Sequence, residues 1–256
     1  MEQIDAVVDM VVQSKKIVVF TGAGFSTESN VPDFRGPQGV WQMFDPSELN
    51  LQNFLRSEEI REKYWKVHKL FWETVREAEP NSGHYAVTEL HNIGKLDCVI
   101  TQNTDGLHQK SGTPDDKVLE LHGTMHWVDC LDCRKRYARE DVHQKMLSGQ
   151  VVPRCDSCNG ILKPATVAYG QAMPERETRE SEHRSATCDL FLAAGSSLVV
   201  YPAAQMPVVA KQSGAKLVIF NLQPTPLDSY ADIAINEKTG ETLSRIVTQV
   251  KEKLQA

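Results

Sequence analysis

The sequence lacks the features of a membrane-spanning, secreted or nucleic-acid-binding protein. None of its apolar runs reaches the roughly 20 residues that a membrane-spanning helix requires. The N-terminal stretch carries acidic side chains and lacks the basic start and apolar block of a signal peptide. The net charge of −6 gives the chain no general attraction to nucleic acid or to anionic membranes. We therefore expect a cytoplasmic protein with neither a nucleic-acid partner nor a membrane partner.

Internal repeats and low-complexity segments are also absent, and the composition is ordinary for a globular protein. Hydrophobic residues make up 41% of the chain and charged residues 24%, values typical of soluble domains. A chain of 256 residues can form one large domain with a small insert and a core of useful size. The 6 cysteines should stay reduced in the cytoplasm unless a metal ion holds them.

A short apolar run followed by two glycines opens the informative part of the chain. Residues 17–20 are Ile-Val-Val-Phe, which predicts a buried strand. Gly22 and Gly24 follow directly, and they permit a tight turn and the close approach of a ligand to the backbone. The third glycine of the dinucleotide-binding fingerprint is missing, because Thr27 stands at that position. These residues alone leave open both a nucleotide site and an ordinary tight turn.

Strand-like and helix-like segments alternate along the chain, which favours an α/β fold with a parallel sheet. We expect strands over residues 17–20, 97–101, 117–121, 166–169, 190–194, 216–220 and 232–235. We expect helices over residues 4–12, within the aromatic-rich stretch 41–79, over 84–93 with Ser82 as the cap, and over 243–254.

Most of the predicted strands end in a polar or glycine-containing cluster. The carboxyl ends of parallel strands lie at one edge of a sheet, where ligands bind in open α/β folds. Turns favour Gly, Asn, Asp and Ser, which explains many of these clusters without a ligand. The pair Gln102-Asn103 and the lone His122 fit that explanation less well. The sequence therefore favours a binding site at this edge of the sheet.

Two pairs of cysteines have the spacing of a zinc ribbon. Cys130 and Cys133 form the first Cys-x-x-Cys pair, and Cys155 and Cys158 form the second roughly twenty residues later. Four thiolates complete a closed tetrahedral site for one structural Zn2+ ion, whereas a redox dithiol would need only one pair. The stretch 128–164 has a net charge of +2, from seven Lys or Arg and five acidic residues, which favours a solvated face over a nucleic-acid surface.

A series of short motifs occurs in a fixed order along the chain. They are Gly22-Ala23-Gly24-Phe25-Ser26, Pro32-Asp33-Phe34-Arg35, Gln102-Asn103-Thr104-Asp105-Gly106, Leu121-His122-Gly123, the two cysteine pairs and Gly195-Ser196-Ser197-Leu198. Together they resemble the sirtuin family of NAD-dependent protein deacylases, over almost the whole chain from about residue 17 to residue 221. Each motif alone is unspecific, but the combination is highly specific.

The resemblance implies that NAD lies extended along the carboxyl edge of a Rossmann-like sheet. The residues expected near the diphosphate are Gly22, Ala23, Gly24, Ser26, Gly195, Ser196 and Ser197, because backbone N–H groups and hydroxyls favour anions. The residues expected near the riboses and the nicotinamide are Asn221 for the adenine ribose, Phe34 and Arg35 on a closing loop, Gln102 and Asn103 for ribose and water, and Asp105 for the carboxamide.

The resemblance also implies a deacylation in which His122 is the general base and Asn103 is the second catalytic residue. A neutral imidazole can take a proton from a ribose hydroxyl near pH 7. The acyl-lysine carbonyl oxygen would displace nicotinamide, and the activated 2′-hydroxyl would then attack the adduct. The products would be nicotinamide, free lysine and 2′-O-acyl-ADP-ribose. His108, three residues after Asp105, is the rival candidate for the base.

The acylated peptide is expected, by the same resemblance, to add as a strand between two segments of the chain. The residues that would bind it are Val167, Tyr169 and Gly170 on one side and Val199 on the other. Main-chain hydrogen bonds would give affinity with little demand on the peptide sequence.

Three positions bear on the choice of acyl group. Gln171 and Thr104 stand where many sirtuins have glutamate and a β-branched apolar residue. Tyr64 is followed by Val67 at the spacing of the Tyr-x-x-Arg pair used for acidic acyl groups. The missing arginine leads us to expect neutral acyl chains.

The predicted architecture is a Rossmann-like parallel sheet with a smaller domain. We assign residues 1–34, 80–126 and 165–256 to the NAD-binding domain, and 35–79 and 127–164 to a small domain made of a helical insert and a four-cysteine zinc module. Two other functions remain open from the sequence: an NAD-dependent ADP-ribosyltransferase or NAD glycohydrolase on the same scaffold, and a non-enzymatic zinc-ribbon binding module.

Overall fold

The computed structural model describes residues 2–33, 45 and 48–255, and its centre is a six-stranded parallel sheet. The strands are β1 (Ile17–Thr21), β2 (Leu96–Thr101), β3 (Val118–Glu120), β7 (Leu190–Ala194), β8 (Lys216–Phe220) and β9 (Ile233–Ile235). Their order is β3-β2-β1-β7-β8-β9, which is that of a doubly wound Rossmann-like sheet. The order in which strands are added to the sheet reverses between β1 and β7, so a ligand crevice is expected at the carboxyl ends of these two strands.

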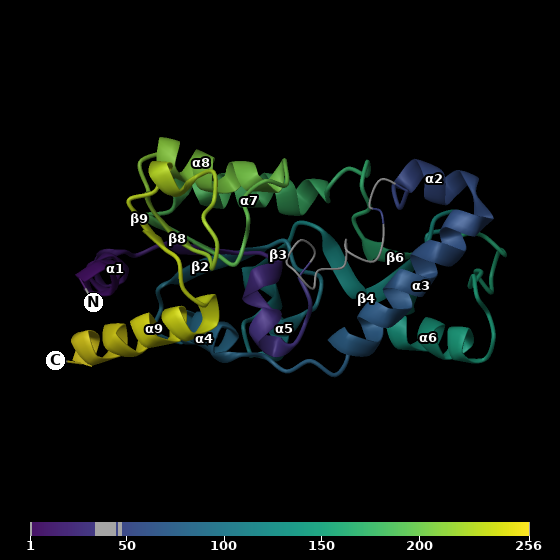
Figure 1. The fold of residues 1–256 in the computed structure, drawn as a ribbon, viewed down its shortest axis with the longest axis horizontal. Coiled ribbons are helices and arrows are strands. Elements are labelled where there is room, and N and C mark those ends of the chain that lie inside the picture. The colour runs from purple at the N-terminus through teal and green to yellow at the C-terminus, as the bar shows by residue number, and fades with distance from the viewer. Residues whose placement is uncertain (1, 34–44, 46–47, 256) are drawn as a thin grey trace.

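Helices cover both faces of this sheet (Figure 1). One face packs against α1 (Glu2–Gln13), α4 (Ser82–Asn92) and α9 (Thr239–Gln255), and the other against α7 (Glu175–Thr187) and α8 (Met206–Gln212). Successive residues of a strand point to opposite faces, so Val19 joins the first core and Val18 the second. This two-sided burial explains why β1 reads as a continuous apolar run.

A smaller region beside the sheet combines helices with an antiparallel sheet (Figure 1). It contains α2 (Leu51–Arg56), α3 (Glu58–Val75), α6 (Arg139–Leu147) and the strands β4 (Gly123–Cys130), β5 (Arg136–Ala138) and β6 (Leu162–Thr166), in the order β5-β4-β6. Trp65 of α3 is fully buried in one core with Val128, Cys155 and Leu162. The helical insert and the cysteine-bearing segment therefore pack together, as predicted for the small domain, whose boundaries stay a prediction.

The strand predicted over residues 166–169 is wrong in position. The strand here is β6, which ends at Thr166, and Tyr169 forms only an isolated bridge to Asn50. Pro164 made residues 162–166 a poor strand candidate, because proline cannot donate to a ladder. β6 lies at the edge of its three-stranded sheet, where a missing donor is tolerated.

The start of α4 also differs from the prediction. Asn81, not Ser82, caps this helix, and its side-chain oxygen accepts from the N–H groups of Gly83 at 2.9 Å and His84 at 3.3 Å. Nδ1 of His84 in turn accepts from the backbone N–H of Asn81 at 3.3 Å, which completes a capping box. Of the helices in the described ranges, none has both the length and the apolar character needed to cross a bilayer.

Candidate functional site

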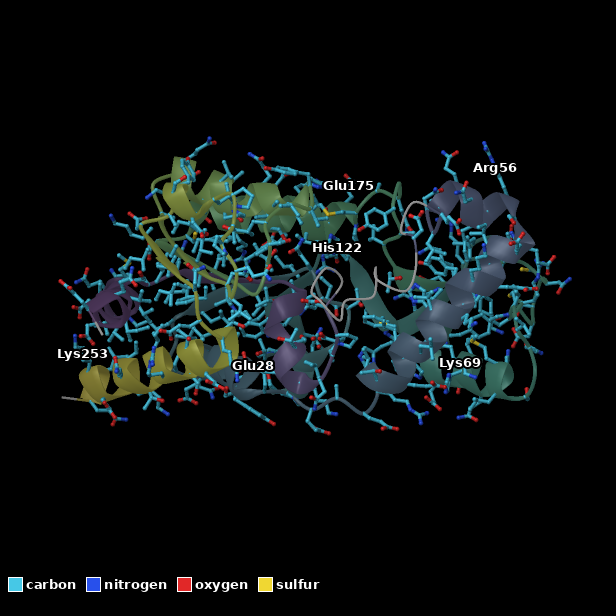
Figure 2. The ribbon with its side chains drawn as sticks, in the orientation of Figure 1. Glu28, Arg56, Lys69, His122, Glu175 and Lys253 are labelled. Carbon is cyan, nitrogen blue, oxygen red and sulfur yellow. The ribbon has the colours of Figure 1, made fainter. Side chains whose placement is uncertain are left out.

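A cleft of about 750 Å³ lies at the carboxyl edge of the sheet, next to the smaller region. Figure 2 shows His122 near the middle of the molecule, between the two regions. The predicted site residues that line the cleft are Ala23, Gly24, Ser26, Gln102, Asn103, Asp105, His122, Val167, Tyr169, Gly170, Gly195, Ser196, Ser197 and Asn221. Segments far apart in the sequence thus meet around one cavity. Phe34 and Arg35 lie outside the described residues.

Gly22 and Val199 are predicted site residues that do not line this cleft. Gly22 lies directly behind it, in the turn that follows β1. Val199 is 45% exposed, and its neighbours Val200 and Tyr201 line the cavity instead. Leu198, with a φ of 55°, turns the chain at this point and is buried itself.

The glycines after β1 allow two backbone turns to pack against each other. The N–H of Gly22 donates to the carbonyl of Ala194 at 3.1 Å, and that of Gly24 donates to Gly195 at 2.8 Å. A Cβ atom on Gly195 would lie 2.2 Å from the backbone nitrogen of Phe25, and Gly195 has a φ of +66°. Glycine is therefore required here for contact between the turns after β1 and β7, in addition to any approach of a ligand.

The backbone at this junction also offers free donors to the cleft. Within the described ranges, the N–H groups of Ala23, Ser196 and Ser197 have no acceptor. All three residues line the cleft. Unpaired N–H groups that converge on one cavity favour an anion, so this corner fits the diphosphate of a dinucleotide.

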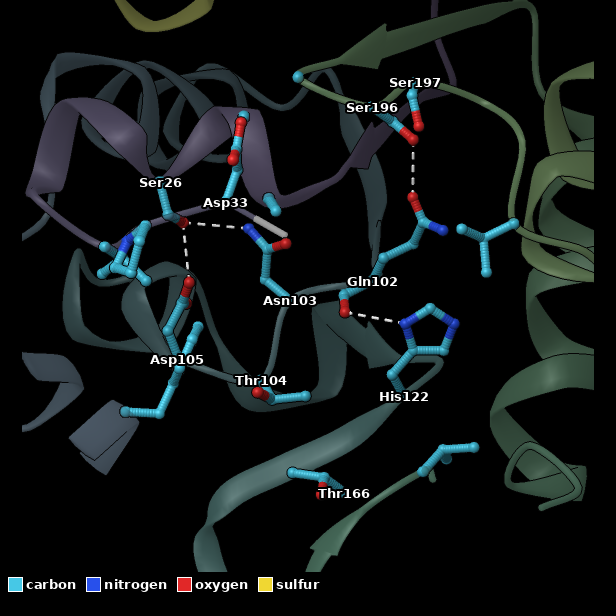
Figure 3. A pocket seen from close by; sticks show the side chains of 18 of the residues that line it. Ser26, Asp33, Gln102, Asn103, Thr104, Asp105, His122, Thr166, Ser196 and Ser197 are labelled. Carbon is cyan, nitrogen blue, oxygen red and sulfur yellow. Dashed lines mark hydrogen bonds between the residues drawn. The ribbon is translucent and has the colours of Figure 1, made fainter. Parts of the chain in front are cut away.

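The segment after β2 is fixed by buried hydrogen bonds (Figure 3). The hydroxyl of Ser26 donates to Oδ2 of Asp105 at 2.7 Å, and the backbone N–H of Leu107 donates to Oδ1 at 3.0 Å. The side-chain amide of Asn103 donates to Ser26 Oγ and to the carbonyl of Gly22, each at 3.0 Å. Burial raises the pKa of Asp105, although these donors oppose the shift. The network joins the β1 turn to the β2 turn.

His122 follows β3 and presents one ring nitrogen to the cleft. Its Nδ1 lies 3.0 Å from the carbonyl oxygen of Gln102 (Figure 3), and because a carbonyl only accepts, Nδ1 carries the proton. Nε2 is then the basic nitrogen. Burial lowers the pKa of His122 below its usual value, so the ring is neutral at pH 7. The backbone carbonyl of His122 accepts from the N–H of Val167 at 2.8 Å, which anchors the histidine to the loop after β6.

His108, the rival for the base, is placed differently. It lies in α5 (Leu107–Lys110), is 2% exposed and does not line the cleft. Its Nε2 bonds to the hydroxyl of Thr21 at 2.9 Å. Burial lowers its pKa to about 3. This position argues against His108 as the group that exchanges a proton with a bound substrate.

The apolar floor of the cleft could not be foreseen from the motifs. It is formed by side chains from the segment that follows the β1 turn, from the residues just before α2, from α3 and from the start of β4, namely Val31, Leu49, Val67, Phe71, Val75 and Met125. Tyr64 and His68 of α3 line the cleft as well, and their rings stack at 4.3 Å between centroids. An apolar periodicity in α3 predicts a buried face, but it does not reveal that the face borders a cavity.

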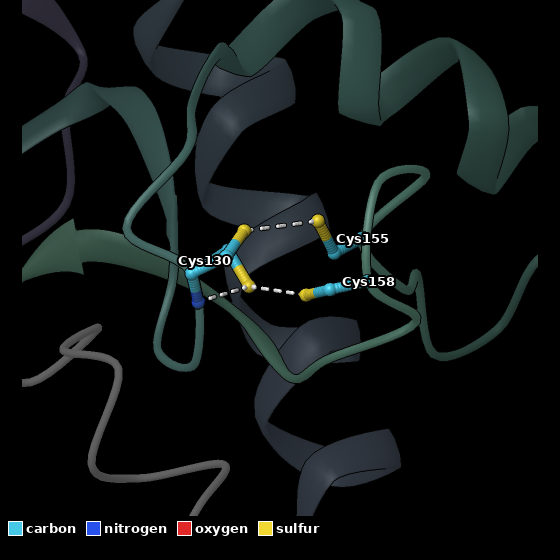
Figure 4. A group of neighbouring side chains, drawn as sticks. Cys130, Cys155 and Cys158 are labelled. Atoms are coloured by element: carbon cyan, nitrogen blue, oxygen red, sulfur yellow. Dashed lines mark hydrogen bonds between the residues drawn. The ribbon is translucent and has the colours of Figure 1, made fainter.

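Four cysteine sulfurs form a compact cluster at the far end of β4 (Figure 4). The Sγ atom of Cys130 lies 3.6 Å from that of Cys158, and the Sγ atom of Cys133 lies 3.6 Å from that of Cys155. All four Sγ atoms lie within 4.8 Å of one another. Zinc–sulfur bonds of about 2.3 Å in a tetrahedron place sulfurs about 3.8 Å apart, so the set fits one structural Zn2+ ion. His143 and His126 are not part of the cluster.

The chain is similar to known proteins along nearly its whole length. The family described as "Sir2 family" matches residues 22–202. The chain is 43% identical over 239 residues to NAD-dependent protein deacetylase 1 of Bradyrhizobium diazoefficiens, covering 93% of each chain. It is 42% identical over 258 residues to NAD-dependent protein deacylase 2 of Archaeoglobus fulgidus, covering 98% of this chain and 97% of that one.

Solved structures show the same similarity. A Sir2 homolog–NAD complex matches with a TM-score of 0.87 at 35% identity, covering 98% of this chain and 94% of that chain. A complex described as Sir2–p53 peptide–NAD+ matches with a TM-score of 0.87 at 37% identity, covering 97% of this chain and 99% of that chain.

Proposed function

We propose a residue-level mechanism on the premise that this chain belongs to the Sir2 family, the sirtuins, as the match over residues 22–202 shows. The chain is an NAD-dependent protein lysine deacylase, which converts NAD and an acylated lysine to nicotinamide, 2′-O-acyl-ADP-ribose and free lysine. Its relatives of about 40% identity are NAD-dependent protein deacetylases and deacylases that it matches over almost their whole length.

The observation that carries the proposal is the environment of His122. Its Nδ1 proton is held by the Gln102 carbonyl at 3.0 Å, which leaves Nε2 as a base on the cleft side. A lowered pKa keeps the ring unprotonated at pH 7. We assign to Nε2 the removal of the proton from the ribose hydroxyl that attacks the acyl carbon.

The residues around the two turns would hold NAD, which supplies the ribose that accepts the acyl group. The free N–H groups of Ala23, Ser196 and Ser197 would receive the diphosphate. Asp105, whose two oxygens already accept from Ser26 and Leu107, would orient the carboxamide. The N–H groups of Gly22, behind the cleft, and of Gly24, in its wall, are not available to NAD, because they bond to the carbonyls of Ala194 and Gly195.

The side-chain amide of Asn103 has its nitrogen occupied and its oxygen available to the reacting groups. Both protons of its amide nitrogen are used, by Gly22 and Ser26. Its Oδ1 atom is therefore the polar end available to a hydroxyl or a water molecule in the cleft. We propose that Asn103 orients the attacking group as an acceptor, while His122 takes the proton.

The acylated peptide would bind over the outer rim of the cleft. Tyr169 and Gly170 are exposed there, and the Tyr169 carbonyl already accepts from the N–H of Leu51 at 2.9 Å. Gln171 closes a turn with Ala168 by two hydrogen bonds. Its N–H donates to the Ala168 carbonyl at 3.0 Å, and its side-chain oxygen accepts from the Ala168 N–H at 3.2 Å. The apolar cleft floor supports neutral acyl chains as substrates.

The decisive experiment incubates the purified protein with NAD and a panel of acyl-lysine peptides, followed by mass spectrometry of all products. We expect free peptide, nicotinamide and acyl-ADP-ribose in equal amounts. NAD consumption without peptide deacylation would favour an ADP-ribosyltransferase or glycohydrolase instead. Zinc binding without NAD consumption would favour a non-enzymatic module. We also propose a cytoplasmic location, which fractionation of the native host cells would test.

A further inference from the structure

A chain of buried polar side chains runs behind the cleft, from α5 to the end of β2. Nε2 of His108 lies 2.9 Å from the Thr21 hydroxyl, and this hydroxyl donates to the Thr101 hydroxyl at 2.8 Å. Thr21 and Thr101 are the last residues of β1 and β2 and face each other in the ladder. The three side chains are at most 2% exposed, and none of them lines the cleft. They lie behind the residues that would meet a substrate.

The direction of the protons along this chain is fixed. Thr21 has one hydroxyl proton, which it donates to Thr101, so its oxygen accepts the next bond from His108. His108 therefore carries its proton on Nε2. Its Nδ1 is buried and has no partner within the part of the chain that the structure describes. The ring ends the chain as a neutral donor that packs against Phe25 and His84.

The other end of the chain is the backbone of Asn103. The Thr101 hydroxyl accepts a second hydrogen bond from the N–H of Asn103 at 3.0 Å. The last ladder contact before this point is the bond from the Gln102 N–H to the Thr21 carbonyl at 2.9 Å. Asn103 has thus left the sheet, and the Thr101 hydroxyl replaces the ladder as its backbone anchor.

We propose that Thr101, supported by Thr21 and His108, is a positioning residue that fixes the backbone of Asn103 and so aims its amide oxygen at the reacting groups. This inference rests on the proposed function, in which Asn103 orients the attacking group. A small shift of a group that orients a reactant has a large effect on rate and a small effect on binding.

The test compares Thr101→Val with Thr113→Val. Valine has nearly the shape of threonine without the hydroxyl. Thr113 is equally buried and bonds to the Thr88 hydroxyl at 2.9 Å, so its variant loses the same kind of bond at a place without contact to Asn103.

We expect kcat of Thr101→Val to fall about tenfold to a hundredfold, with KM for the acetyl-lysine peptide little changed. The two variants should lower the melting temperature by similar amounts. Thr113→Val, however, should leave kcat close to that of wild type. Thr101→Ser keeps the hydroxyl and should restore kcat.

A second measurement does not depend on turnover. It is amide hydrogen exchange of the segment 102–106, measured by mass spectrometry on the protein without ligand. Exchange should be faster in Thr101→Val than in Thr113→Val, because the Asn103 N–H loses its acceptor. If Thr101→Val does not fold, His108→Phe keeps a ring beside Phe25, removes the donor to Thr21 and should change kcat and exchange in the same direction.

The outcomes separate this inference from the proposed function. Equal kcat and equal exchange in Thr101→Val and Thr113→Val would overturn the positioning role. A wild-type protein that never deacylates would overturn the proposed function. In that case, faster exchange limited to Thr101→Val would still support the anchoring of Asn103, and unchanged exchange would reject it.

Discussion

The hydroxyl of Ser196 donates to Oε1 of Gln102 at 2.7 Å. Ser196 follows β7 and Gln102 follows β2, and these strands are the two neighbours of β1. The bond therefore passes over the end of β1 and joins the two halves of the doubly wound sheet (Figure 3). It also holds the residue whose carbonyl orients His122.

This bond predicts coupled effects on NAD binding. Ser196→Ala should raise the Kd for NAD about fivefold, since a lost hydrogen bond costs about 1 kcal/mol. Gln102→Ala should have an effect of similar size, and the double variant should lose little more than either single one. Calorimetry on the three variants measures this cycle. Strictly additive losses would mean that the two side chains act separately.

Removal of the proposed base, His122, should abolish the chemistry without abolishing binding. His122→Ala should lower deacylation turnover about 10²–10⁴-fold, the usual contribution of a positioned general base. Binding of ADP-ribose, measured by calorimetry, should change much less, because the free N–H groups lie on the β1 and β7 turns. His183 is exposed on α7, so His183→Ala is the control. Near-normal turnover of His122→Ala, or inactivity confined to His108→Ala, would contradict the assignment.

Two buried histidines predict how stability depends on pH. Burial lowers the pKa of His84 to about 2 and that of His108 to about 3, whereas an unfolded histidine titrates near pH 6.5. Between about pH 6.5 and pH 3 the unfolded chain binds protons that these folded rings refuse, so their stabilisation is present above pH 6.5 and is lost as the pH falls. Each ring should contribute a slope of about 1.4 kcal/mol per pH unit in this range.

Denaturant unfolding of wild type and His108→Gln at several pH values measures that slope. The variant should lose less stability than wild type between pH 6 and pH 4, by about 1.4 kcal/mol per pH unit. His183→Gln, at an exposed position, should follow wild type. Parallel curves for wild type and His108→Gln would show that His108 is not held neutral in the folded state.

Loss of the metal should unfold the smaller region. Cys155→Ser removes one sulfur from the cluster, and structural zinc contributes on the order of 10 kcal/mol in small zinc domains. We expect aggregation or a strongly lowered melting temperature, with zinc absent from the protein by mass spectrometry. Cys188→Ser changes a buried cysteine outside the cluster and should keep its zinc. A folded, zinc-free Cys155→Ser protein would disprove the structural role.

The sequence predicted those parts of the molecule that short patterns encode. The apolar run at β1, the Cys-x-x-Cys pairs and the polar residues at strand ends depend on neighbours in the chain, and the structure brings them together as expected. The position of β6 was missed because Pro164 disfavours a strand unless it lies at a sheet edge. Edge position is a property of the whole sheet, so no local pattern contains it.

The remaining parts of the site depend on contacts between distant segments. The side chains of Val67 and Phe71 look like ordinary core residues in the sequence, and only the packing of α3 places them beside the cleft. The same holds for Gly195, whose glycine requirement comes from Phe25 in another turn. His108 and His122 both follow a predicted strand, and only their different burial in the structure favours His122 over His108 as the proposed base.

One consequence of strand β4 concerns the range of electrostatic forces. It begins at Gly123, next to His122, and ends at Cys130, so an extended strand of this length spans roughly 25 Å. Two unit charges about 25 Å apart interact by only about 0.7 kcal/mol at an effective dielectric constant of about 20, so the charge at the cysteines has a small effect on His122. Exchange of zinc for another divalent ion that keeps the fold also keeps this charge, so it should leave the basicity of the His122 imidazole unchanged.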